Sequence, residues 1–227
     1  MAQLQFSDEQ IQDLAVLRDT PLEVFANAAD RLNHADKLIL RPEELLKVVE
    51  TALDGRVDLA NRLLRQCLSL NGLMRQTGLS IDEIEAGIRS ALSAHWSPDQ
   101  MATWDAAARA FGKFLRNEQF RLVTKAIELS YDYANLYRKG RIIADIRPLF
   151  SDDATSVVGS VVSYTLRLRF DRSDGDQELS IAMDQRDVEE LSLQCARAIQ
   201  KGRTARDLML QHRQIPTIIT GDKVPAE

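Results

Sequence analysis

The side chains best suited to bind a metal ion or to act as a nucleophile or base in this 227-residue sequence are those of three histidines and two cysteines. His34, His95 and His212 stand far apart, and none shares a short motif with Cys, Asp or Glu. Zinc sites and activated nucleophiles need such residues in characteristic short spacings or paired with a base. The sequence also lacks G-x-S-x-G, P-loop, G-x-G-x-x-G and H-E-x-x-H motifs. We therefore expect no metal, no cofactor and no enzymatic activity, and keep as an alternative an enzyme whose site is assembled from distant residues.

The two cysteines, Cys67 and Cys195, each lie inside a strongly helical pattern. Free cysteines are among the most buried residue types, so we expect two buried, reduced thiols. The sequence begins with no basic and apolar leader, and no window approaches the roughly 18 apolar residues of a membrane span. Reduced thiols and the absence of these signals predict a cytoplasmic protein without a membrane span.

Tyrosines and basic residues gather just before residue 140. Tyr131, Tyr133 and Tyr137 fall at what the periodicity predicts to be the end of a long helix over residues 117–139. We expect Tyr131 and Tyr137 to face inward and to have a structural role at a domain junction. Gly140 is the expected left-handed residue that ends this helix.

A second basic stretch lies in the predicted last helix. It could contact nucleic acid, and this alternative is a regulatory protein that binds DNA or RNA through the end of that helix. The formal net charge of -5 and a sequence pI near 5.4 make nucleic acid an unlikely partner. Positive charge near a helix C-terminus is also explained by the helix dipole. The residues of this basic patch are Arg197, Lys201, Arg203 and Arg206.

Several helix N-termini can be recognised from the sequence, and these helices help to position the residues above. Ser7 with Gln10, Ser80 with Glu83 and Ser97 with Gln100 each form the sequence pattern of a capping box. Pro21 and Pro42 mark two further starts, since proline is favoured in the first helical turn. Residues 1–140 are thus expected to form a bundle of six or seven helices.

After residue 140 the apolar period changes from that of a helix to that of a strand. Apolar and polar residues alternate strictly over 162–170, and 141–147 and 179–183 give two more strand patterns. A long helix follows from Asp184. We therefore expect an α+β fold in which a helical domain (1–140) precedes a β-β-β-α module (141–213) of three antiparallel strands closed by one helix. The tail (214–227) contains the β-prone segment IPTIIT, which could add a strand to a sheet edge.

One helix can cover only one face of a three-stranded sheet, so a second face stays open. Such a face is either solvated or pairs with another chain, and the second reading predicts a homo-oligomer. The expected interface residues on this open face are Ile143, Ser163, Thr165, Arg167 and Arg169.

The C-terminal module resembles the COMM-domain proteins. The segments that carry this resemblance are RIIADIRPLF (141–150), VVSYTLRLRF (161–170), ELSIAM (178–183) and the helix over 184–202. The resemblance implies dimerisation with a second copy or a related COMM-like chain through interleaved sheets and helices. It further implies a non-enzymatic scaffold subunit that binds another protein, whose identity the sequence does not indicate.

Overall fold

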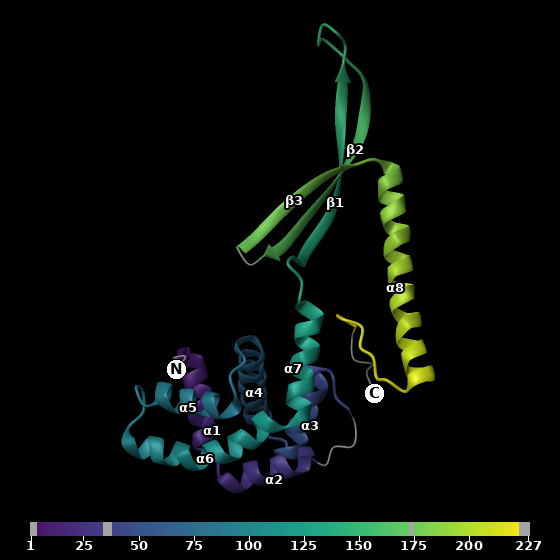
Figure 1. The fold of residues 1–227 in the computed structure, drawn as a ribbon. Coiled ribbons are helices and arrows are strands. Elements are labelled where there is room, and N and C mark those ends of the chain that lie inside the picture. The colour runs from purple at the N-terminus through teal and green to yellow at the C-terminus, as the bar shows by residue number, and fades with distance from the viewer. Residues whose placement is uncertain (1–3, 34–37, 173–174, 223–227) are drawn as a thin grey trace. The chain divides into compact units, whose positions relative to one another are not determined.

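The computed structural model describes residues 4–33, 38–172 and 175–222 (Figure 1). It shows the expected α+β class, with helices first and a three-stranded antiparallel sheet followed by one helix. The chain divides into two units, Met1–Ser130 and Tyr131–Glu227, so the division falls before the predicted boundary at residue 140.

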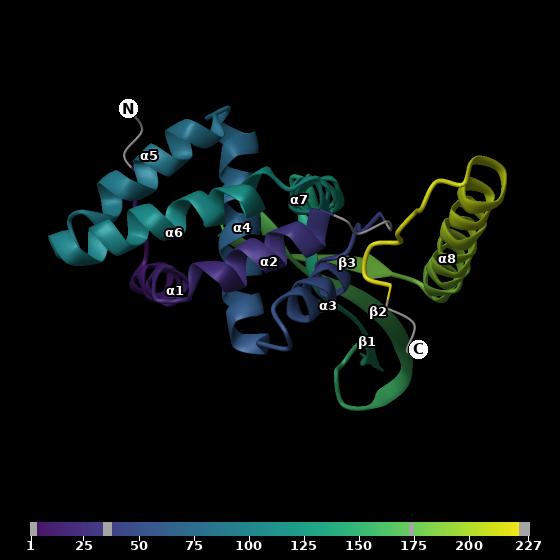
Figure 2. The same cartoon turned by 90° about the horizontal axis from the view of Figure 1, so that it is seen from below.

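Seven helices build the first unit (Figure 2). Five of them (α1, α2, α3, α5 and α6) begin where the sequence shows a helix-start signal, and the serine caps have the predicted geometry. The Oγ atoms of Ser7, Ser80 and Ser97 accept hydrogen bonds from the N3 amides at 3.3, 3.2 and 3.3 Å. The helices are α1 (Asp8–Arg18), α2 (Leu22–Asn33), α3 (Pro42–Ala52), α4 (Val57–Thr77), α5 (Ile81–Leu92), α6 (Pro98–Arg116) and α7 (Glu118–Tyr131).

The hydrophobic core of the described chain lies entirely in this helical unit. Its largest buried side chain is Trp104, whose ring centroid lies 5.8 Å from that of Trp96 and 5.9 Å from that of Phe111. Phe25 and Phe114 meet edge to face at 5.9 Å, which joins α2 to α6. Aliphatic residues at helical spacing on the other helices complete a packed interior.

The predicted helix over 117–139 is wrong in its second half. Helix α7 ends at Tyr131, and the first strand, β1, spans Leu136–Phe150. Gly140 lies inside this strand and does not have the positive φ of a helix cap. A Cβ at Gly140 would lie 2.9 Å from the hydroxyl oxygen of Tyr137 and 3.2 Å from Leu168. The glycine therefore leaves room for the Tyr137 side chain, which a Cβ would displace, and it does not form a turn.

The three strands form one antiparallel sheet in the order β1-β2-β3, with β2 over Val157–Arg172 and β3 over Gly175–Met183. Gly175 has φ +112°, the positive value expected for the turn, whereas residues 173 and 174 lie outside the described chain. Pro148 does not stop β1, because β1 is an edge strand and tolerates a missing N–H donor. The β1–β2 ribbon extends past the end of β3, which pairs with β2 only from Tyr164 onward.

The last helix, α8 (Gln185–Arg213), begins at a capping box in which Asp184 accepts from the Asp187 amide at 2.9 Å. Residues 215–220 (IPTIIT) do not add a strand to the sheet of their own chain, and their pairing with the sheet edge of another chain stays a prediction. They follow α8 instead, where Ile219 would lie 3.9 Å from a Cβ at Gly202, and Asp222 pairs with Arg206 at 3.2 Å. None of the residues of α8 is buried.

Candidate functional site

One face of the sheet is apolar and uncovered. Side chains alternate between the two faces of a strand, so the register places one set of apolar residues on a common face. Ile142, Leu166 and Ile181 form one row across the three strands, and Ile146 on β1 is 74% exposed. Among residues 131–172 and 175–222 no side chain is buried. The remaining members of this apolar face are Val158, Val162, Tyr164, Leu168, Phe170, Leu179 and Met183.

The opposite face of the sheet is polar, and it holds the residues that were predicted as an interface. Ile143 lies opposite Thr165, and Ser163, Arg167 and Arg169 follow at alternate positions on β2. The register thus brings all five onto one face. Ser163 Oγ is buried without a hydrogen-bond partner in the described part of the chain.

Four cations meet at one end of this polar face. Lys139 stands directly opposite Arg169, and Arg141 stands directly opposite Arg167 on the neighbouring strand. These four side chains and Glu178 on β3 line a small hollow of about 100 Å³. We call this group the cationic cluster. Lys139 and Glu178 were not predicted as site residues, because the sequence pattern placed Lys139 in a helix and the register of β3 is not visible in the sequence.

Glu178 is the only carboxylate lining the hollow as described. Arg169 Nε donates a hydrogen bond to its Oε2 at 2.9 Å. This hydrogen bond is the main reason why the pKa of Glu178 lies below its ordinary value of 4.5. Desolvation opposes the shift, and the charges of Arg169, Arg167 and Arg141 add to it. The side chains of Lys139, Arg141 and Arg167 make no hydrogen bond and no ion pair with the side chain of a described residue.

The predicted basic patch on α8 does not share one face. Helical geometry places Arg197 and Lys201 near one another, whereas Arg206 lies on the opposite side of the helix from Arg197. Arg206 is also paired with Asp207 and Asp222, both at 3.2 Å. Arg203 is exposed. The four side chains therefore do not form a single surface.

The two cysteines have different environments. Cys67 is buried in α4 as predicted, and burial raises the pKa of its thiol well above its ordinary value. Cys195 is exposed on α8, so the prediction of a second buried thiol is wrong. Tyr131, Tyr133 and Tyr137 are also exposed, which contradicts the predicted inward orientation of Tyr131 and Tyr137.

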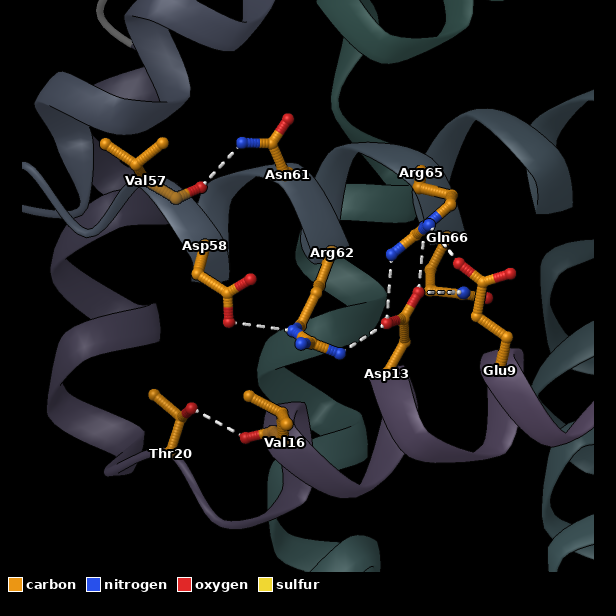
Figure 3. Close-up of polar contacts among 10 residues, drawn as sticks. All are labelled: Glu9, Asp13, Val16, Thr20, Val57, Asp58, Asn61, Arg62, Arg65 and Gln66. Carbon is orange, nitrogen blue, oxygen red and sulfur yellow. Dashed lines mark hydrogen bonds and ion pairs between the residues drawn. The ribbon is translucent and has the colours of Figure 1, made fainter.

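A buried carboxylate in the helical unit has a structural explanation (Figure 3). Asp13 on α1 is fully buried, and it is surrounded by side chains of α4. Arg62 Nη1 and Gln66 Nε2 donate to it at 2.8 Å each, and Arg65 Nε lies 2.9 Å away. With every oxygen satisfied by α4, Asp13 joins the two helices and offers no free lone pair for a ligand.

The histidines do not come together in the described structure. His95 lines a surface hollow of about 560 Å³ between α5 and residues 4–6, together with mostly apolar neighbours. His212 is exposed in the last turn of α8, and His34 lies outside the described residues. Among the residues described, no three His, Cys, Asp or Glu side chains are grouped as a metal ion would require.

Comparison with known proteins adds no relatives to this picture. No protein-family model matches the sequence, and no curated protein matches it. Within the described ranges, no helix is both long enough and apolar enough to cross a membrane.

Proposed function

We propose that this chain is a non-enzymatic protein-interaction subunit that dimerises through residues 131–227. The observation that carries the proposal is the absence of any buried side chain among the described residues of this unit. A folded domain normally buries one face of its sheet and one stripe of its helix against another layer. Here neither the apolar sheet face nor α8 has a buried side chain, which supports a covering layer supplied by another molecule.

The solvent-accessible area of the chain agrees with the lack of buried side chains in this unit. The chain exposes 15516 Å², whereas two separate compact units of half its mass would expose about 12,600 Å² in total. The difference is roughly 3,000 Å², which is sufficient for each chain's share of an obligate dimer interface, about 1,000–2,500 Å². An interface of that size would cover the apolar face of the sheet together with α8.

A second copy is the partner that fits this surface. The unit offers an uncovered sheet face and an uncovered amphipathic helix, so α8 of each chain could cover the sheet of the other. Such a reciprocal exchange would form a two-fold symmetric dimer in which the apolar sheet face of each chain is covered by α8 of the other. The COMM-like order of the elements supports the same arrangement. The helical unit, which has its own core, would then present its surface to a further protein partner, and the buried thiol of Cys67 agrees with a cytoplasmic location.

Light scattering on the full chain tests this proposal. We expect twice the chain mass of 25.6 kDa over the accessible concentration range. Ile181→Lys places a charge in the middle of the apolar face and should shift the mass toward that of one chain. Val57→Lys, at a comparably exposed residue of α4, is the matched control and should leave the mass unchanged. A wild-type chain that stays monomeric at high concentration contradicts the proposal.

The same measurement decides which face of the sheet is in the interface. The residues Ile143, Ser163, Thr165, Arg167 and Arg169 remain a prediction for the polar face. If Arg167→Glu with Arg169→Glu dissociates the dimer and Ile181→Lys does not, the polar face is the interface. The opposite result places the interface on the apolar face, as proposed.

A further inference from the structure

We propose that the cationic cluster on the polar face of the sheet binds the diphosphate group of a small soluble compound. The site consists of Lys139, Arg141, Arg167 and Arg169, with Glu178 beside them. Four cations and one carboxylate give the hollow a net charge of +3 before a ligand binds. This inference concerns the face opposite the proposed dimer interface and does not rest on dimerisation.

The arrangement of the cluster is unfavourable without an anion. Side chains directly opposite on antiparallel strands lie about 5 Å apart at Cβ, and like charges there destabilise the sheet. The cluster contains two such pairs in succession, Lys139 with Arg169 and Arg141 with Arg167. Glu178 forms a hydrogen bond only with Arg169, and its charge is too small to neutralise the other three cations. A bound anion would remove repulsion that the fold otherwise has to tolerate.

The chemistry and size of the hollow favour phosphate. Guanidinium groups bind phosphate oxygens through two parallel hydrogen bonds, and three of the four cations are arginines. A hollow of about 100 Å³ can take one or two phosphate groups and leaves no room for a larger buried ligand. A diphosphate is preferred to a single phosphate because its greater negative charge better matches the excess of three cations. The rest of the ligand would extend into solvent, since the arginines that line the hollow are exposed.

The test uses the full chain and inorganic pyrophosphate as the probe. We expect saturable binding by calorimetry with one site per chain, and a rise in the melting temperature of the sheet-containing unit. Sodium chloride at the same ionic strength should not reproduce that rise. Arg141→Gln with Arg167→Gln should weaken pyrophosphate binding by at least about tenfold, the factor expected when a single charge-assisted hydrogen bond is lost.

Two controls separate the site from the fold. Arg147→Gln changes an arginine of the same strand on the same face, opposite Val161 and away from the cluster, and should bind pyrophosphate like the wild type. Without anion, the Arg141→Gln, Arg167→Gln variant should be at least as stable as the wild type, because a repulsive pair has been removed. That result would show that its loss of binding is not caused by unfolding.

Three outcomes would overturn the inference. The first is no saturable pyrophosphate binding by the wild type. The second is an equal loss of binding in Arg147→Gln, which would show diffuse charge attraction in place of a site. The third is citrate binding as tightly as pyrophosphate, which would show a preference for charge alone and not for phosphate. Failure of the dimer test above would leave all three readouts interpretable, because they require only the folded sheet.

Discussion

At the scale of single residues, Glu178 sets the charge of the cationic cluster. Its carboxylate accepts from Arg169 and stands beside Arg141 and Arg167, so it shields part of their mutual repulsion. Its pKa is lower in the folded chain than in the unfolded one, so the unfolded chain binds more protons. The stability contributed by Glu178 is therefore complete above its ordinary pKa of 4.5 and is lost as the pH falls through the lowered folded value.

Glu178→Gln should remove both the negative charge that shields the cations and the pH dependence of stability that Glu178 contributes. We expect the variant to melt at a lower temperature at pH 7, because the four cations lose the negative charge of the carboxylate that lines the hollow with them. Its pyrophosphate affinity should rise for the same reason. Between pH 5 and pH 3 it should lose less stability than the wild type, as followed by thermal melts in a low-salt buffer. If the stability of the variant has the same pH dependence as that of the wild type, Glu178 does not interact electrostatically with the cationic cluster.

The buried ion pair of Asp13 makes a second prediction at this scale. Asp13→Ala removes the common partner of Arg62, Arg65 and Gln66 and should destabilise the helical unit by about 3 kcal/mol. This value lies at the lower end of the range for broken buried pairs, because both arginines are partly exposed. Asp58→Ala removes the exposed partner of the same Arg62 and should cost less than about 1 kcal/mol. Equal losses in urea unfolding of the two variants would contradict this explanation.

At the scale of elements, the helix starts depend on local chemistry. The Ser80 hydroxyl caps α5, and Glu83 reaches back to the Ser80 amide at 2.8 Å. These hydrogen bonds lower the pKa of Glu83, so the cap is strongest above the ordinary pKa of a glutamate and weakens as the pH falls through the lowered value.

Ser80→Ala should therefore destabilise the helical unit by about 1 kcal/mol at pH 7. The difference from the wild type should shrink in acid, when Glu83 is protonated. Ser90→Ala on the same helix is the control: it alters an exposed position in the last turn and should change the stability by less than about 0.5 kcal/mol. Urea unfolding at pH 7 and at a pH below the lowered pKa of Glu83 measures both effects.

The same scale shows what the sequence can and cannot predict. Capping boxes at Ser7, Ser80 and Ser97 and the alternation over 162–170 were confirmed, because each depends on residues close together in the chain. The end of α7 was not predicted, since residues 136–139 become a strand only by pairing with distant residues of β2. The cationic cluster depends on that same long-range register, so its Lys139 and Glu178 were missed.

At the scale of the whole molecule, the two units differ in how they satisfy their apolar side chains. The helical unit buries its own apolar side chains, whereas those described in the second unit are half-buried or exposed. The fold class could be predicted because the apolar period changes once along the chain. The exposure of α8 and of the apolar sheet face could not be predicted. The apolar periodicity of α8 is the same whether the helix packs on the sheet of its own chain or on a second chain.

Calorimetry should therefore resolve two transitions. The transition of the helical unit should not depend on protein concentration. The transition of residues 131–227 should move to higher temperature as the concentration increases, because dimerisation stabilises only the folded form. In Ile181→Lys, the second transition should fall or disappear while the first is kept. A single transition that is independent of concentration would contradict the division into a self-sufficient unit and a partner-dependent one.

The β1–β2 ribbon beyond the end of β3 has a further consequence for the chain in a cell. Over 145–163 it is only two strands wide, and Leu149, Phe150, Val157 and Val161 are exposed on it. Two-stranded ribbons are at best marginally stable in water. Under the proposed dimerisation, a newly made chain would display this segment to chaperones and proteases until a second copy binds. Cellular abundance would then follow assembly more closely than synthesis, and an unmatched copy would be cleared first by cleavage in this ribbon.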